Sequence, residues 1–128
     1  MTEADNVLFS TALAHWSPLQ LNAEFARSAG HRDVVVNPML VLCTVVGLSV
    51  EDLSEAGGPF LGLDDCVFHR PAHPGDTVSA RSTVIALRDS ERFAHSGIVS
   101  WHTEAHNQHD DLVVEFDRTN LVAKRRAS

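Results

Sequence analysis

Histidines are the side chains of this sequence best suited to moving protons, and there are eight of them in 128 residues. An imidazole with a pKa of about 6.5 can serve as an acid or a base at neutral pH, and it can also bind a metal ion. Two of the eight precede the most apolar segment of the chain: His15, which follows a short helical pattern, and His31, in the loop before that segment. Both are candidates for acid–base chemistry. The alternative for His15 is that it only ends the first helix and interacts with its last carbonyls.

The other six histidines do not have the spacing of a metal site. No two of them form a His-x-x-x-His pair on an expected helix with a third, acidic ligand. The two cysteines, Cys43 and Cys66, are far apart and form neither a disulfide framework nor a metal-ligand motif. We therefore expect no metal site, no cofactor and a reducing, cytoplasmic environment. The six lie on expected strands and turns: His69, His73, His95, His102, His106 and His109.

Net charge and hydropathy exclude several classes of partner. The formal net charge is −7, and the basic residues cluster only at 124–126. Nucleic-acid binding needs a basic stripe that replaces counterions, so we expect none. We also expect no membrane span, because about 20 consecutive apolar residues are required. Without a signal peptide, repeat or linker in the pattern, residues 1–128 are predicted to form a single domain.

The element most able to organise this domain is a helix predicted from Asn37 to Leu53. Asn37 is a good N-cap, and Pro38 follows at the first helical position, where its missing N–H costs nothing. Only Thr44 is polar between residues 39 and 46. A helix that is apolar on all sides is buried, so we expect the remainder of the domain to surround it.

The segments around this helix predict an α+β fold. Short helices are expected at 2–13 and 23–29, before the apolar helix. In the second half the pattern changes to the period-two alternation of an antiparallel sheet with one packed face. Together they predict a curved antiparallel sheet around one buried helix. The strands are expected at 60–69, 76–88, 96–106 and 111–124.

The order and spacing of several motifs resemble the MaoC-like (R)-hydratase/dehydratase family, and most closely its mesaconyl- and itaconyl-CoA hydratase-like branch. The resemblance implies the hotdog fold, in which a curved antiparallel sheet wraps around a long central α-helix. It begins partway into the family pattern, so we expect the family's N-terminal strand to be absent. The motifs lie at 2–6, 18–26, 36–40, 46–50, 68–71, 75–77, 87–90, 97–99, 107–108 and 116–119.

The resemblance implies addition of water to an α,β-unsaturated thioester, or the reverse. In the family motif Gly-Asp-x-Asn-Pro-x-His, the Asp and the His hold the reacting water. The matching segment here is 14–20, in which His15 replaces the Asp and Gln20 replaces the His. Gln20 can orient water but cannot transfer a proton. His15 and Gln20 are therefore the predicted catalytic positions, with His15 as the acid or base.

Four further residues are predicted to bind substrate, together with His31. Asn37 and Met39 lie at the start of the central helix, where hotdog enzymes direct free N–H groups at the thioester oxygen. Since Pro38 has no N–H, we expect Met39 to supply the contact, unless Asn37 only caps the helix. Arg88 and Arg92 are predicted to contact the phosphates of coenzyme A, or else to lie at a solvated hairpin end.

Three functions are compatible with this pattern. The first is an enoyl-thioester hydratase or dehydratase with an altered catalytic pair, and the second is a non-catalytic acyl-CoA-binding subunit that completes the pocket of an active paralogue. The third is a hotdog thioesterase, although no Asp or Glu is well placed before Glu51. Because the sheet would leave an edge exposed, we expect a homodimer or a heterodimer with a paralogue. The acyl group, and the choice between coenzyme A and an acyl carrier protein, stay open. Asp64, Asp65 and Asp76 are expected at the surface or in turns.

Overall fold

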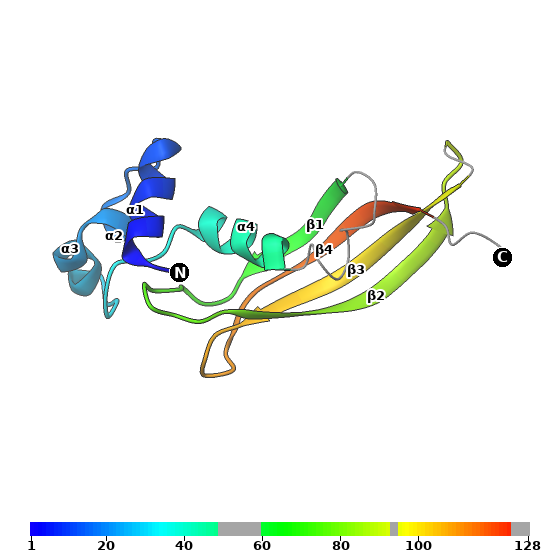
Figure 1. The fold of residues 1–128 in the computed structure, drawn as a ribbon. Helices are drawn as coiled ribbons and strands as arrows, with labels where there is room; N and C mark the ends of the chain where they lie inside the picture. Colours follow the sequence, from blue (N-terminus) through cyan, green and yellow to red (C-terminus); the bar gives the residue numbers. More distant parts are fainter. Residues whose placement is uncertain (49–59, 93–94, 124–128) are drawn as a thin grey trace.

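Four helices come first along the chain and four strands follow (Figure 1). The computed structural model describes residues 1–48, 60–92 and 95–123. This order of helices and strands confirms the α+β class predicted from the sequence. The elements are α1 (Glu3–Ala12), α2 (Pro18–Leu21), α3 (Ala23–Ser28), α4 (Pro38–Leu48), β1 (Phe60–Phe68), β2 (Ser79–Asp89), β3 (Ser96–His106) and β4 (Leu112–Ala123).

The short helices begin at side-chain caps. Thr2 and Asp5 form a capping box at the start of α1, in which each side chain accepts the backbone N–H of the other residue. The side chain of Asn22 accepts the N–H of Phe25 at 3.1 Å and starts α3. Between them, Pro18 occupies the first position of α2, a helix that the sequence analysis did not predict.

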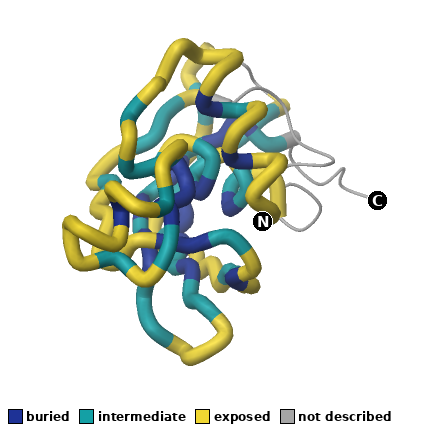
Figure 2. Tube along the Cα trace, turned by 90° about the vertical axis from the view of Figure 1, so that its left-hand side faces the viewer, coloured by how far each residue is buried: buried dark blue, intermediate teal, exposed yellow. Residues whose placement is uncertain are grey.

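The four strands form one antiparallel sheet in the order β1-β4-β3-β2. Side chains alternate between its two faces, as the pattern of β3 and β4 predicted. On the inner face, Ala105 of β3 and Phe116 of β4 are fully buried. They form the hydrophobic core together with Val41 and Val45 of α4. The sheet therefore packs one face against α4, and Figure 2 shows the buried positions gathered in the interior of the trace.

Helix α4 is less buried than the sequence predicted. Val41 and Val45 are buried, but Met39 is 40% exposed and Leu48 is 51% exposed. The expectation of a helix buried on all sides was therefore wrong for a single chain, because one sheet covers only one side of a helix. Residues 49–53 of the predicted helix lie outside the described residues.

Helices α1, α2 and α3 lie together beyond one end of the sheet (Figure 1). The segment before α4 connects these helices to the sheet. The Val35 N–H donates to Leu19 O of α2 at 2.7 Å, and the Val36 N–H donates to Ala72 O, between β1 and β2, at 2.8 Å. In the part of the chain that the structure describes, no helix is long and apolar enough to cross a membrane.

Asp76 makes a second link between the helical region and the sheet. Its carboxylate accepts hydrogen bonds from Arg32, from the His73 N–H and from Gln108. Burial, the largest single influence, opposes ionisation, but these three bonds together lower the pKa of Asp76. Only 4% of the residue is exposed. Asp76 therefore follows the predicted turn, where its N–H donates to His73 O at 3.0 Å, but it is buried and does not lie at the surface.

Candidate functional site

His15 lies just after the end of α1, where the chain turns sharply. Ala14 has a φ of 56°, in the left-handed region, at the position where the family motif has its glycine. The turn lets the backbone N–H of His15 donate to Ser10 O at 2.7 Å. The ring is exposed on one side, and on the other its Nδ1 lies 3.1 Å from Asn37 Nδ2. The turn thus places an imidazole at the N-terminus of α4.

Asn37 fixes the orientation of that imidazole. Its Oδ1 accepts the Met39 N–H at 3.0 Å, so its Nδ2 is the atom that faces Ser10 Oγ at 3.3 Å and the ring of His15. Because an amide NH₂ can only donate, the Nδ1 atom of His15 accepts and the proton of the neutral ring lies on Nε2. Nε2–H of His15 is then the group presented outward.

Behind this pair lies a polar side chain that the sequence analysis missed. Asn6 of α1 is fully buried; its Nδ2 donates to Gln20 O at 3.2 Å and to Val35 O at 3.1 Å, and its Oδ1 accepts the Asn37 N–H at 2.7 Å. Asn6 therefore holds α1, α2 and the start of α4 together. The signal was present, because Asn6 and Ser10 are polar residues four apart and share one face of α1.

Gln20 lies on α2, and Asn6 links its backbone to the start of α4. Its Oε1 atom is buried and has no hydrogen-bond partner among the described residues. A buried acceptor without a partner is costly, and bound water or a ligand group often supplies the missing donor. The structure therefore brings together the N-terminus of α4, His15 and the segment that carries Gln20.

The other predicted residues have different surroundings. The Met39 N–H donates to Asn37 Oδ1 at 3.0 Å, so in this arrangement it is not free to contact a thioester oxygen. His31 lies near His73, with ring centroids 5.9 Å apart. Arg88 and Arg92 are exposed, at and just after the end of β2 that lies farthest from α1–α3 in Figure 1. A site combining these arginines with His15 would have to span two chains.

A largely apolar groove runs between α1 and α4, with a volume of about 540 Å³. It includes Leu40, in the first turn of α4, and Ala12, at the end of α1 close to His15 in sequence. The groove is within the size range of small-molecule sites. Its lining consists of Met1, Asp5, Leu8, Phe9, Ala12, Leu40 and Thr44.

Comparison with known proteins identifies close relatives. The chain is 40% identical over 109 residues to mesaconyl-CoA hydratase of Haloarcula hispanica, a match of 84% of this chain and 30% of the relative. It is 33% identical over 125 residues to β-methylmalyl-CoA dehydratase of Chloroflexus aurantiacus, covering 98% of this chain and 35% of that protein. The chain thus spans about a third of the length of these curated relatives.

Solved structures give the same answer for the fold. A MaoC domain protein dehydratase from Chloroflexus aurantiacus superposes with a TM-score of 0.91 at 32% identity, over 98% of this chain and 36% of that one. The hotdog fold expected from the sequence is therefore confirmed. The family model for mesaconyl-CoA hydratase matches residues 1–128. With the motifs, the fold and the matched length in agreement, the chain belongs to the mesaconyl-CoA hydratase family.

Proposed function

We propose that this chain adds water reversibly to an α,β-unsaturated acyl thioester, of the mesaconyl type, carried by coenzyme A or an acyl carrier protein. The observation that carries the proposal is the hydrogen-bonded contact between His15 and Asn37 at the N-terminus of α4. It places a group able to exchange protons beside helix N–H groups able to stabilise an enolate-like oxygen. Family membership supports the same reaction.

The groove between α1 and α4 is the proposed acyl site. Its largely apolar lining suits the methyl group and alkene carbons of the acyl group, and Leu40 contributes to it from the first turn of α4. An α-helix leaves its first N–H groups without intrahelical acceptors. Since Asn37 already accepts the Met39 N–H, the Leu40 N–H takes the place of Met39 as the proposed donor to the thioester oxygen.

The proposed water lies between His15 and Gln20. Gln20 Oε1, buried without a partner among the described residues, can accept one proton of the water in a hydrogen bond. To remove the other proton at Nε2, His15 must carry its own proton on Nδ1. Asn37 then has to rotate its amide so that Oδ1 faces the ring, which gives up the hydrogen bond from the Met39 N–H and frees that group beside the Leu40 N–H. After hydroxide adds to Cβ, the imidazolium of His15 returns the proton from Nε2 to Cα, which completes the addition of water. Proton transfer by His15 is thus coupled to Asn37.

A second candidate function follows from the same contact. With Nδ2 of Asn37 donating to the ring and a glutamine at position 20, the resting arrangement offers no free base. The alternative is a non-catalytic subunit that binds the acyl thioester and partners an active paralogue. Restoring the family pair with His15→Asp and Gln20→His discriminates between the two. The double variant gains activity if the chain is a silent subunit and loses it if His15 already works.

A homodimer is part of the proposal. Val84, Ile85 and Leu87 of β2 are 51%, 52% and 73% exposed in the single chain, an unusual amount of apolar surface for a strand. A second copy of this chain would cover such surface and bring Arg88 or Arg92 of one copy towards the site of the other. Sedimentation at micromolar concentration is expected to show a dimer, and a 14.0 kDa species would contradict this.

The function is tested by following loss of the enoyl-thioester absorbance. We expect turnover by the wild type, and a fall of about 10²–10⁴-fold for His15→Ala, the usual contribution of a positioned acid–base group. Thioester binding should survive, because the groove and helix N-terminus remain. His109→Ala, on an exposed turn, is the matched control and should leave the rate unchanged. A wild type that turns over the thioester without dependence on His15 would refute the assignment.

A further inference from the structure

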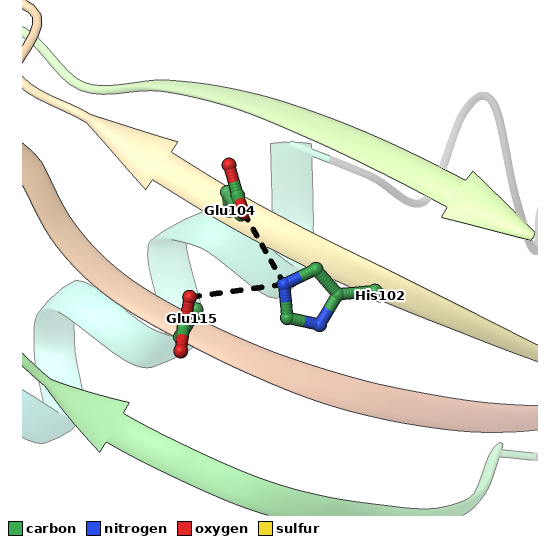
Figure 3. Close-up of side chains that lie close together, drawn as sticks. All are labelled: His102, Glu104 and Glu115. Carbon is green, nitrogen blue, oxygen red and sulfur yellow. Dashed lines mark ion pairs between the residues drawn. The ribbon is translucent and has the colours of Figure 1, made fainter. Parts of the chain in front are cut away.

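The outer face of the sheet carries a cluster of ionisable side chains that the proposed reaction does not use. Thr103 and Phe116 are buried on the inner face, so the residues that alternate with them point the other way. His102 and Glu104 of β3 and Glu115 of β4 therefore share the outer face. Figure 3 shows their side chains directed towards one another.

The ligand atoms of this cluster have the separations of a metal site. His102 Nε2 lies 3.4 Å from Glu104 Oε1 and 3.7 Å from Glu115 Oε2. All three ligand atoms lie within 4.8 Å of one another. A tetrahedral ion with bonds of about 2.0–2.1 Å keeps its ligand atoms about 3.3 Å apart, so only small side-chain movements are needed.

A fourth residue orients the histidine for this role. Asp117 Oδ1 lies 2.7 Å from His102 Nδ1, so the ring donates from Nδ1 and the lone pair of the neutral ring lies on Nε2. Nε2 is the atom that faces the two glutamates. A carboxylate that holds the distal nitrogen of a histidine is the usual outer partner of a metal-ligating imidazole.

Charge and access also suit a cation. Glu104 and Glu115 together carry the two negative charges that balance a divalent ion, and their side chains are 41% and 29% exposed. Water can therefore enter and complete the coordination. On the far side of Glu115, His69 Nε2 lies 3.5 Å from its other carboxylate oxygen and steadies it.

We propose that His102, Glu104 and Glu115 bind one divalent transition-metal ion, with Asp117 as the positioning residue. Mixed nitrogen and oxygen ligands favour Zn²⁺ over Mg²⁺ and Ca²⁺, which prefer oxygen alone. This revises the expectation of no metal site, which rested on spacing along a helix. In a sheet, two ligands can come from residues i and i+2 of one strand, and a third from the residue paired with one of them on the adjacent strand.

The test is calorimetric titration of ZnCl₂ into the tag-free protein. We expect one Zn²⁺ ion to bind per chain and EDTA to remove it. Titration with MgCl₂ should show much weaker binding. Asp117→Asn should weaken Zn²⁺ binding by about 10–100-fold, as loss of an outer partner does. His102→Asn, Glu104→Gln and Glu115→Gln should each weaken it at least as much.

His106→Asn is the matched control, because this residue is also on β3 and alternates onto the outer face without belonging to the cluster. It should bind Zn²⁺ like the wild type. Circular dichroism establishes that each variant is folded before titration. The proposal fails if the wild type binds no Zn²⁺ at millimolar concentration. It fails equally if folded His102→Asn and Glu115→Gln bind as tightly as the wild type.

Discussion

Two histidines in this molecule are held by the same ring atom and in opposite ways. At the N-terminus of α4, the Nδ1 atom of His15 faces the NH₂ group of Asn37 at 3.1 Å. On the outer face of the sheet, the Nδ1 atom of His102 faces the carboxylate of Asp117 at 2.7 Å. The first ring must accept at Nδ1 and the second donates there. The partner of Nδ1 therefore decides whether Nε2 is a donor or a free lone pair.

The two partners also differ in burial. Asn37 is 2% exposed and its side chain bonds to three groups, whereas the side chain of Asp117 is 26% exposed. A buried amide that accepts an N–H at the start of a helix is part of the folded core. Water can replace the hydrogen bond of a carboxylate near the surface. We expect the amide to contribute to stability and the carboxylate to binding.

The largest effect predicted from this difference concerns Asn37→Leu. The change removes the cap of α4 and leaves buried partners unpaired, at a cost of about 2–4 kcal/mol in the free energy of unfolding. Asp117→Leu should cost less, about 1 kcal/mol, because ion pairs that solvent reaches contribute little and this pair is only partly buried. Urea unfolding of both variants measures this. Equal losses would mean that the two histidines are held equally firmly.

A smaller effect is expected at the joint between the two regions, from Asp76→Asn. Because the folded pKa of Asp76 is lowered, its stabilisation is present above the ordinary carboxyl pKa and disappears as the pH falls through the folded value. At pH 7 we expect a loss of about 1.5–3 kcal/mol, the value of hydrogen bonds to a charged group.

The pH series distinguishes this effect from a general loss of packing. The difference between the wild type and Asp76→Asn should shrink as the pH is lowered below about 4, where the ordinary carboxyl becomes protonated. Asp110→Asn is the control, since that side chain is 85% exposed. A deficit that persists unchanged at acid pH would argue against the assigned role of the carboxylate.

The smallest predicted effect tests the turn that presents His15. Alanine in the left-handed region is strained by about 1 kcal/mol, so Ala14→Gly should stabilise the protein by up to that amount. The matched control is Ala12→Gly, within α1, which should destabilise it by about 0.5–1 kcal/mol. Thermal unfolding of the two variants is the measurement. Destabilisation by both would show that the turn at Ala14 is not strained.

Much of the fold was predictable because it depends on local patterns. The period-two alternation placed β3 at 96–106, as observed, and placed β4 within one residue at each end. The cap and proline at the start of α4 marked its beginning correctly. The burial of α4 was overestimated, because the apolar composition of a helix does not tell which of its sides the rest of the same chain covers.

The candidate site was less predictable because its contacts join distant segments. Sequence and family motif identified His15, but the hydrogen bond from Asn37 that sets its tautomer spans 22 positions. The burial of Asn6 and Asp76 likewise depends on partners far along the chain. Spacing along one element also could not find the cluster around His102, which needs the register of β3 against β4.

The central claim is that His15 transfers protons through Nε2 when the partner of its Nδ1 can accept. Asn37→Asp tests it most directly, because a carboxylate supplies that acceptor without rotation and still caps α4. It makes the surroundings of His15 resemble those of His102. We predict that kcat/KM for the enoyl thioester rises about tenfold or more, with full dependence on His15. A folded Asn37→Asp variant that is no faster than the wild type would contradict the account.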